Sequence, residues 1–155
     1  MKITKTENLS NEQKQRIVEL WNAEYPVQLW HPDTRSFDDY LSELGNPEYY
    51  LLVDENENIK GWLACFIRRD EKWFALLIDS REQKKGYGSQ LLNSVKEFEA
   101  EINGWVIDRD TDLKANGETY RSPLGFYEKN DFEILLDVRL ESETMSAVKI
   151  RWVRK

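Results

Sequence analysis

The sequence has one cysteine and one histidine among its 155 residues. Cys65 cannot form a disulfide within the chain, and one cysteine with one histidine gives too few nitrogen and sulfur ligands for a structural zinc ion. Disulfide frameworks and structural zinc are therefore excluded, and no metal is expected. We predict that Cys65 is a buried packing residue rather than a nucleophile.

Long hydrophobic runs are also missing. The longest, Trp62–Ile67 and Trp73–Ile78, are much shorter than the roughly 18–20 apolar residues that a membrane-spanning helix needs. The segment Met1–Asn8 is polar where a secretory signal has its apolar stretch. The sequence therefore predicts a cytoplasmic protein without a transmembrane helix.

Basic residues are fewer than acidic residues. The chain has 22 Lys and Arg residues and 29 Asp and Glu residues, which gives a net charge of -7. Proteins that bind nucleic acid or anionic membranes rely on a positive field to displace counterions. We therefore expect neither nucleic acid nor membrane as a partner. The charge favours small cationic partners, although the same charge also serves simply to keep a protein in solution.

The apolar content is sufficient for one folded core. Hydrophobic residues make up 40% of the chain and aromatic residues 12%, which is more than a disordered chain carries. The length lies within the range of about 100–200 residues that single cores commonly have. The sequence therefore predicts one domain over residues 1–155.

The spacing of apolar and turn residues predicts a mixed order of helices and strands. Helices are expected at 11–25 and 36–44 with a loop at 27–35, then strands at 49–53, 59–67 and 73–78, a helix from Gly86 to Ile102 closed by Gly104, a strand at 105–107, a helix at 120–129, and strands at 132–140 and 146–153. The early strands should pair antiparallel, and the strand after the long helix can pair parallel with 73–78.

The segment Ile78–Leu92 is the most informative part of the chain, because an apolar strand passes through a polar, glycine-containing turn into an amphipathic helix. Gly86 and Gly88 let the backbone approach a ligand closely, and the first N–H groups of a helix lack internal partners, so such a turn can bind phosphate. Lys84 and Lys85 add positive charge. The alternative is a plain strand-to-helix turn with solvated lysines.

Two common phosphate motifs do not fit this turn. The dinucleotide fingerprint requires Gly or Ala where this chain has Leu91, and no Gly-Lys-Ser/Thr sequence completes a P-loop. The run Gln83-Lys84-Lys85-Gly86-Tyr87-Gly88 instead resembles the Gln/Arg-x-x-Gly-x-Gly/Ala signature of the GNAT superfamily of acyl-CoA-dependent N-acyltransferases.

A second block strengthens the resemblance. The segment Tyr120–Phe132 is similar to the later helix of that family, which commonly ends in a Phe-Tyr-Glu-Lys-x-Gly-Phe type of sequence; Asp131 stands here in place of the glycine. The two blocks cover Trp73–Phe132. The resemblance implies a GNAT-like α+β fold, in which helices flank a mostly antiparallel central sheet.

The resemblance also implies a binding site for acetyl-CoA as cosubstrate. The backbone N–H groups of residues 84–89 would hold the CoA pyrophosphate, with Tyr87 mainly a spacer, and the strand before the turn would pair with the pantetheine arm. The implied cofactor-binding residues are Leu76, Leu77, Ile78, Gln83, Lys84, Lys85, Gly86, Tyr87, Gly88 and Ser89. An N–H group of Leu76 or Leu77 could stabilise the oxyanion.

Three residues are candidate catalytic groups. Tyr127 lies where the family often places a tyrosine that protonates the departing thiolate; the alternative is that Tyr127 packs in the core and Phe126 faces the ligand. The acceptor amine must also lose a proton, and Asp79 and Asp108 are candidate bases, although either could be a turn-forming or solvated acid. Direct attack in a ternary complex is the expected mechanism.

The acceptor in this family binds near the first two helices and the last strands. Here Trp30, Tyr25 and Tyr40 could form an aromatic wall for a cation or could be core residues, and His31 could relay protons or lie on the surface. The resemblance implies an N-acetyltransferase that acts on a primary amine of a small molecule or peptide, and a homodimer is possible. The alternative is a non-catalytic acyl-CoA sensor or interaction module.

Overall fold

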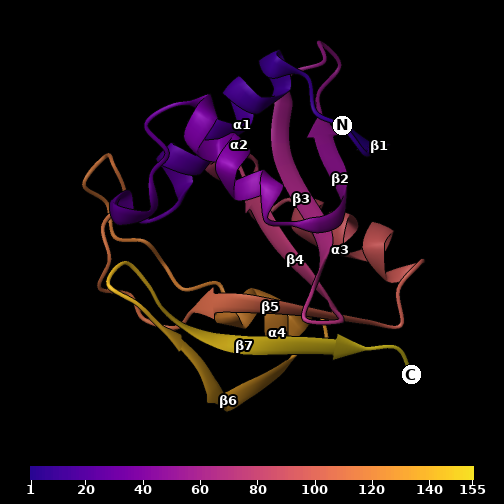
Figure 1. Ribbon diagram of the computed structural model, residues 1–155, viewed down its shortest axis with the longest axis vertical. Helices are drawn as coiled ribbons and strands as arrows, with labels where there is room; N and C mark the ends of the chain where they lie inside the picture. Colours follow the sequence, from indigo (N-terminus) through magenta and orange to yellow (C-terminus); the bar gives the residue numbers. More distant parts are fainter.

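A computed structural model describes residues 1–155 and shows one seven-stranded sheet with strand order β1-β2-β3-β4-β5-β7-β6 (Figure 1). The elements in chain order are β1 (Lys2–Thr6), α1 (Asn11–Glu24), the 3-10 helix η1 (Val27–Leu29), α2 (Thr34–Ser42), β2 (Gly45–Val53), β3 (Ile59–Arg68), β4 (Glu71–Ile78), the 3-10 helix η2 (Ser80–Glu82), α3 (Tyr87–Lys96), β5 (Glu101–Ile107), α4 (Leu124–Lys129), β6 (Glu133–Glu141) and β7 (Ser146–Val153).

The sheet has two antiparallel parts that meet at a parallel pair. Strands β1 to β4 follow one another antiparallel, and β7 lies antiparallel between β5 and β6. The crossover through α3 makes β4 and β5 the parallel pair, as predicted. This mixed α+β arrangement confirms the predicted GNAT-like fold class.

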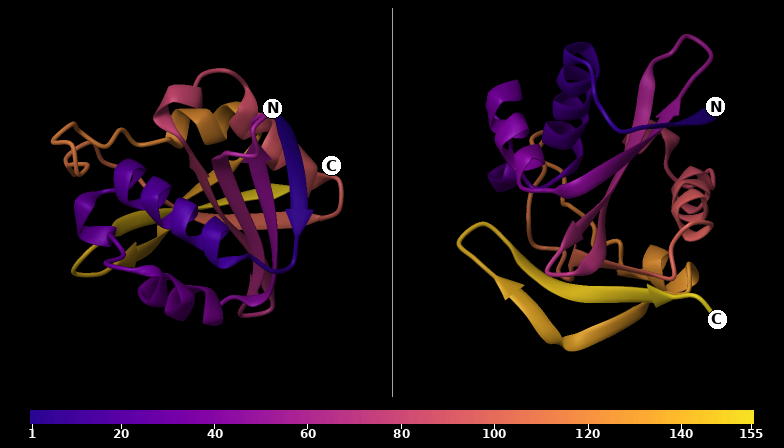
Figure 2. Two further views of the ribbon diagram at one scale, coloured as in Figure 1. Left: turned by 90° about the horizontal axis from the view of Figure 1, so that it is seen from above. Right: turned by 45° about the vertical axis from the view of Figure 1, so that its right-hand side comes forward.

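Each face of the sheet has its own hydrophobic core. Helices α1 and α2 cover one face and α3 and α4 cover the other, as Figure 2 shows. The first core includes Ile17, Phe37 and Trp62, and the second includes Leu91 and Phe132; all five are buried. Cys65 is 1% exposed within the second core, which confirms its predicted burial.

The prediction was wrong about the end of the third helix. Helix α3 ends at Lys96, Phe98 is 66% exposed, and Ile102 belongs to β5. Gly104 does not end a helix but lies inside β5, where a Cβ atom would come within 2.8 Å of the Phe74 ring. The helical spacing of Ile102 was coincidental, because one buried residue of a following strand can continue a helical pattern.

Other boundaries differ for local reasons. Strand β1 was not predicted, and Asp33 caps α2 so that the helix begins at Thr34. Helix α4 begins only at Leu124, since Pro123 disfavours helical geometry in the residue before it. The Ser122 hydroxyl instead donates to the carbonyl of Ile107 at 2.6 Å.

The structure contains no helix with the length and apolar character of a membrane-spanning segment.

His31 is expected to make stability depend on pH. The side chain is buried, its Nδ1 lies 2.7 Å from the Ser36 hydroxyl, and its Nε2 has no partner. Burial lowers the pKa of His31 below the ordinary histidine value of about 6.5. Below about pH 6.5 the His31 side chain therefore binds a proton in the unfolded chain but stays neutral in the folded protein. The free energy of unfolding then falls as the pH drops below that value.

Urea unfolding at pH 7.5 and 5.5 tests this expectation. His31→Phe keeps a ring in the pocket formed by Trp21 and Phe37 but cannot bind a proton. Because His31 is the only histidine, the wild type should lose more stability than the variant between the two pH values. An equal loss in both proteins would show that other groups cause it.

Candidate active site

Strands β4 and β5 separate after a short contact. Their only register pair is Trp73 with Asn103, so the rest of β4 toward its carboxyl end has no partner on that side. In Figure 1 the upper part of the sheet, which ends with β4, turns away from the lower part formed by β5, β7 and β6. The separation leaves an open strand edge inside the sheet.

The hydrogen-bond alternation of β4 identifies which backbone groups face this edge. The N–H of Asp79 donates to the carbonyl of Lys60 at 2.9 Å, so the backbone N–H and C=O groups of Asp79 point toward β3. Alternate residues then point the other way, because antiparallel partners exchange bonds at every second position. Leu76 and Ile78 therefore direct their N–H and C=O groups to the open edge, whereas Leu77 directs its groups to β3.

Two side chains donate hydrogen bonds to the backbone carbonyls at this edge. The Tyr25 hydroxyl, at the end of α1, donates to the carbonyl of Leu76 at 3.0 Å. The Gln83 amide donates to the carbonyl of Ile78 at 3.0 Å and so fixes the start of the glycine-containing turn. These bonds explain how β4 keeps its extended form without β5 beside it.

The turn between β4 and α3 presents free backbone donors. Lys84 has φ 64° and Gly86 has φ 87°, both left-handed. None of the N–H groups of residues 84–89 donates to a backbone or side-chain acceptor of the protein, and α3 has no side-chain N-cap. Successive free N–H groups at such a turn form an anion-binding concavity at a helix N-terminus. The residues present thus fit a phosphate-containing group.

Gly86 and Gly88 are required for different structural reasons. Gly86 has open space where a Cβ would be, so a side chain would fit there, and glycine is favoured because the backbone is left-handed. A Cβ on Gly88 would come within 2.8 Å of the Phe126 ring, so its reason is the contact between α3 and α4. The Phe126 ring therefore lies against the first turn of α3.

Tyr127 lies deeper than Phe126. Its side chain is 6% exposed and its ring contacts the rings of Phe74 and Phe132 at centroid distances of 5.7 and 5.4 Å. The hydroxyl has no hydrogen-bond partner within the protein. Burial raises the pKa of Tyr127 far above its ordinary value, and the nearby Tyr120 adds to this effect. The phenol therefore keeps its proton at neutral pH.

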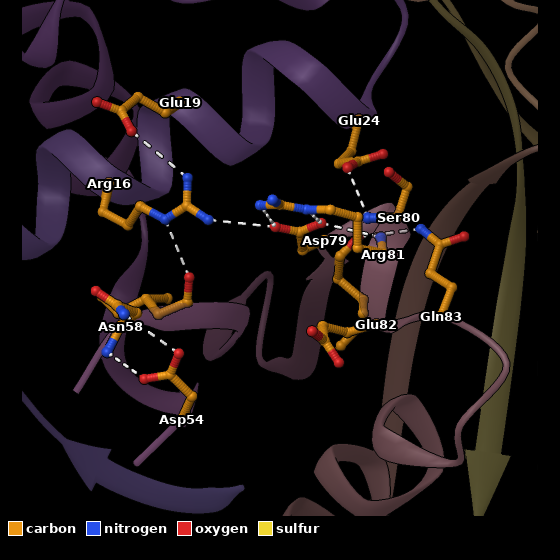
Figure 3. Close-up of polar contacts among 12 residues, drawn as sticks. Arg16, Glu19, Glu24, Asp54, Asn58, Asp79, Ser80, Arg81, Glu82 and Gln83 are labelled. Atoms are coloured by element: carbon orange, nitrogen blue, oxygen red, sulfur yellow. Dashed lines mark hydrogen bonds and ion pairs between the residues drawn. The ribbon is translucent and has the colours of Figure 1, made fainter. Parts of the chain in front are cut away.

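Asp79 is held by arginines. Its carboxylate accepts from Arg81 at 2.8 and 3.1 Å and from Arg16 at 3.2 Å, and it caps η2 through the N–H of Arg81 (Figure 3). The side chain is 5% exposed. The hydrogen bonds from Arg81 outweigh desolvation and lower the pKa of Asp79 to about 2. This geometry gives Asp79 a clear role in fixing the end of β4.

Asp79→Asn should therefore lower stability at neutral pH. The folded pKa of about 2 lies below the ordinary aspartate value of about 3.9. The carboxylate therefore contributes about 2 kcal/mol above pH 4 and loses this contribution as the pH falls toward 2. Urea unfolding at pH 7 should show the difference between wild type and variant, which should shrink in acid. Glu19→Gln is the control, because Glu19 is an exposed partner of the same Arg16.

Asp108 also has an arginine partner. Arg139 on β6 donates to both carboxylate oxygens at 2.8 and 3.0 Å and lowers the pKa of Asp108. The neighbouring Asp110 accepts from the N–H of Ser122 at 2.6 Å. No group of three or more His, Cys, Asp and Glu side chains is arranged to hold a metal ion.

Sequence reasoning missed Glu24, the last residue of α1. Its Oε2 accepts from the N–H of Ser80 at 2.7 Å, and Lys114 Nζ lies 3.1 Å from its Oε1 without the alignment of a hydrogen bond. Both side chains are largely buried, at 8% and 13% exposed. No local sequence signal marks such a pair, since the partners lie far apart in the chain.

The Glu24–Lys114 pair is one of several contacts that hold the 108–123 loop to the end of α1. The N–H of Val27 donates to the carbonyl of Leu113 at 2.8 Å, and Gln28 donates to Asp112 at 2.9 Å. Figure 1 shows this loop beside the segment that follows α1. The loop therefore covers the side of the open edge nearest α1.

The residues predicted to lie near the acceptor amine have different environments. Trp30 is 58% exposed, whereas His31 is buried and is not a surface residue. Tyr25 and Tyr40 pack against Trp21 at centroid distances of 4.7 and 5.1 Å, as core aromatics do. Two polar surface cavities, of about 410 and 340 Å³, lie near the N-terminal end of α1 and include no residue of β4 or of the turn at 83–89.

Comparisons with known proteins identify the family of the chain. A family model described as an acetyltransferase (GNAT) domain matches residues 46–134. A search of curated proteins finds no match.

Solved structures share the fold at low identity. An aminoglycoside 6′-acetyltransferase type Ii has a TM-score of 0.72 and 16% identity, covering 99% of this chain and 97% of its own. A phosphinothricin acetyltransferase from Sinorhizobium meliloti in complex with AcCoA has a TM-score of 0.68 and 12% identity, covering 99% and 89%. A mutant spermidine/spermine N-acetyltransferase from Vibrio cholerae has a TM-score of 0.64 and 14% identity, covering 98% and 95%.

The family model spans more than half of the chain, including the open edge of β4, the turn into α3 and Tyr127. The same turn carries the signature from which the family was predicted. The chain therefore belongs to the GNAT acetyltransferase family.

Proposed function

We propose that the protein is an acetyl-CoA-dependent N-acetyltransferase that acts on a primary amine of a small molecule or peptide. The observation that carries the proposal is the row of free N–H groups at residues 84–89, directly after an open strand edge. A phosphate-containing, strand-like ligand matches both features at once. A plain strand-to-helix turn would also leave the first helical N–H groups free, but it would not explain why β4 and β5 separate just before it.

In this proposal the turn holds the CoA pyrophosphate and β4 holds the pantetheine arm. Leu76 and Ile78 are the residues whose backbone groups face the open edge and can pair with the amides of the ligand. The N–H of Leu76, rather than that of Leu77, would donate to the thioester oxygen as negative charge develops there. Gln83 would keep the turn in place through its bond to Ile78.

The transfer joins the acceptor nitrogen to the thioester carbon and breaks the bond between that carbon and sulfur. The thiolate then needs a proton, and Tyr127 is proposed to supply it, because its hydroxyl is protonated and has no hydrogen-bond partner within the protein. The burial that raises the pKa of the free phenol opposes this step, so the thiolate must lie within hydrogen-bond distance of the hydroxyl. The acceptor must react as the neutral amine, although a free alkylamine has a pKa of about 10.4.

The base that removes the amine proton is proposed from the carboxylates already predicted. Asp79 and Asp108 remain the candidates, but the arginines that lower the pKa of each carboxylate also make it a weak base. Asp79→Asn and Asp108→Asn should therefore lower kcat less than Tyr127→Phe does. A kcat that neither Asp79→Asn nor Asp108→Asn lowers would remove both carboxylates as bases.

Thiol release from acetyl-CoA tests the function. The protein is mixed with acetyl-CoA and, in turn, with an aminoglycoside, a polyamine and a peptide with a free N-terminus, since the compared structures include enzymes described for the first two. Acetylated amine with stoichiometric free CoA supports the proposal. Acetyl-CoA binding without transfer to any amine would favour the alternative function, a non-catalytic acyl-CoA sensor. Light scattering tests whether the protein forms a homodimer.

A further inference from the structure

Tyr25 reaches the open edge of β4 from the end of α1. It is the C-cap residue of that helix, and its backbone N–H donates to the carbonyl of Trp21. The Trp21 ring meets the Tyr25 ring edge-on at 4.7 Å, which fixes the direction of the phenol. The hydroxyl then donates to the carbonyl of Leu76 at 3.0 Å. Burial raises the pKa of Tyr25, so the hydroxyl keeps its proton and remains a donor.

This bond replaces one that a neighbouring strand would make. The N–H and C=O groups of Leu76 point to the same side of β4, where β5 would supply both an acceptor and a donor if pairing continued. Pairing with β5 is confined to Trp73. Tyr25 supplies the missing donor for the carbonyl, and no residue of β5 supplies an acceptor for the N–H. The strand is thus held from one side while its N–H stays available.

We propose that Tyr25 is a positioning residue, whose hydroxyl fixes the Leu76 backbone so that the Leu76 N–H points at the thioester carbonyl oxygen of acetyl-CoA. The inference rests on the proposed function. An unpaired edge residue could rotate its peptide planes, and a donor aimed in advance stabilises developing charge better than one that must reorient. A carbonyl oxygen has two lone pairs, so an amide of the ligand can share the Leu76 carbonyl with Tyr25.

Tyr40 provides a matched control. Its ring lies 5.1 Å from that of Trp21 in the same aromatic cluster, and burial raises the pKa of Tyr40 to about 12. Its hydroxyl, however, makes no hydrogen bond within the protein. Tyr25→Phe and Tyr40→Phe each remove one oxygen from the same cluster, but only the first removes a bond to β4.

Infrared difference spectroscopy with acetyl-CoA carrying ¹³C at the thioester carbonyl tests the role without any acceptor. A hydrogen bond from Leu76 lowers the frequency of the carbonyl stretch in the bound ligand. We expect this lowering in the wild type and in Tyr40→Phe, and a smaller one in Tyr25→Phe. The dissociation constant, measured by calorimetry, should stay within about threefold of the wild-type value in both variants, and the loss of one hydrogen bond should leave Tyr25→Phe folded.

The outcomes separate this inference from the proposed function. If the wild type does not bind acetyl-CoA, both are overturned. If all three proteins bind it and show the same carbonyl frequency, the role of Tyr25 is overturned and the proposed function stands. If Tyr25→Phe loses more than about tenfold in affinity while its bound ligand keeps the wild-type carbonyl frequency, Tyr25 contributes to binding and not to positioning, and the inference is again overturned.

Discussion

Acetyl-CoA at one hundred times its dissociation constant should stabilise the wild-type protein by about 2.7 kcal/mol and should stabilise Gly86→Asp hardly at all. For a chain of this length the wild-type stabilisation corresponds to a rise in Tm of about 5–10 °C. The substitution places a carboxylate beside the free N–H groups of the turn, where it repels the pyrophosphate and can take up the same donors. Thermal unfolding with and without acetyl-CoA measures both responses.

Gly117→Asp is the control for backbone strain. Gly117 has φ 86°, close to the φ 87° of Gly86, and both have open space where a Cβ would be. The two variants therefore carry the same intrinsic cost of a left-handed aspartate, but Gly117 lies in the 108–123 loop, outside the turn. A rise in Tm that survives in Gly86→Asp would mean that CoA binds somewhere other than this turn.

Lys114→Met is expected to cost about 3 kcal/mol of folding free energy, because removing one partner of a buried ion pair leaves the other charge uncompensated. Glu24 keeps its bond to the N–H of Ser80 but loses the ammonium group that lies 3.1 Å from its Oε1. The loss should also loosen the 108–123 loop, with faster hydrogen exchange at the Val27 N–H, which donates to the carbonyl of Leu113. Urea unfolding at pH 7 gives the free-energy change.

Lys85→Met is the matched control, because Lys85 pairs with Glu82 at 3.0 Å but is 53% exposed. Exposed pairs of this kind contribute about 0–1 kcal/mol. The double variant Glu24→Gln, Lys114→Met should recover part of the stability, since it removes both charges. If Lys114→Met costs no more than Lys85→Met, the buried pair does not hold the loop.

The sequence by itself determined the parts of the site that are continuous in the chain. The turn at residues 83–89 follows from a strand, two glycines and a helix in direct succession, and its left-handed backbone at Gly86 is a local property. The order of helices and strands was also largely predictable, because apolar periodicity is local. The errors at Ile102 and Gly104 arose where a strand continued the period of the helix before it.

The tertiary structure alone decided how distant segments meet around this turn. Tyr25 bonds to Leu76 across 51 residues of chain, and Arg16 reaches Asp79 across 63. Asp79 was predictable as an acid beside the signature, but only folding revealed the arginines that lower its pKa. Such contacts depend on how helices pack on the sheet, and the physical reason is that packing places side chains by shape and burial, which no local pattern encodes.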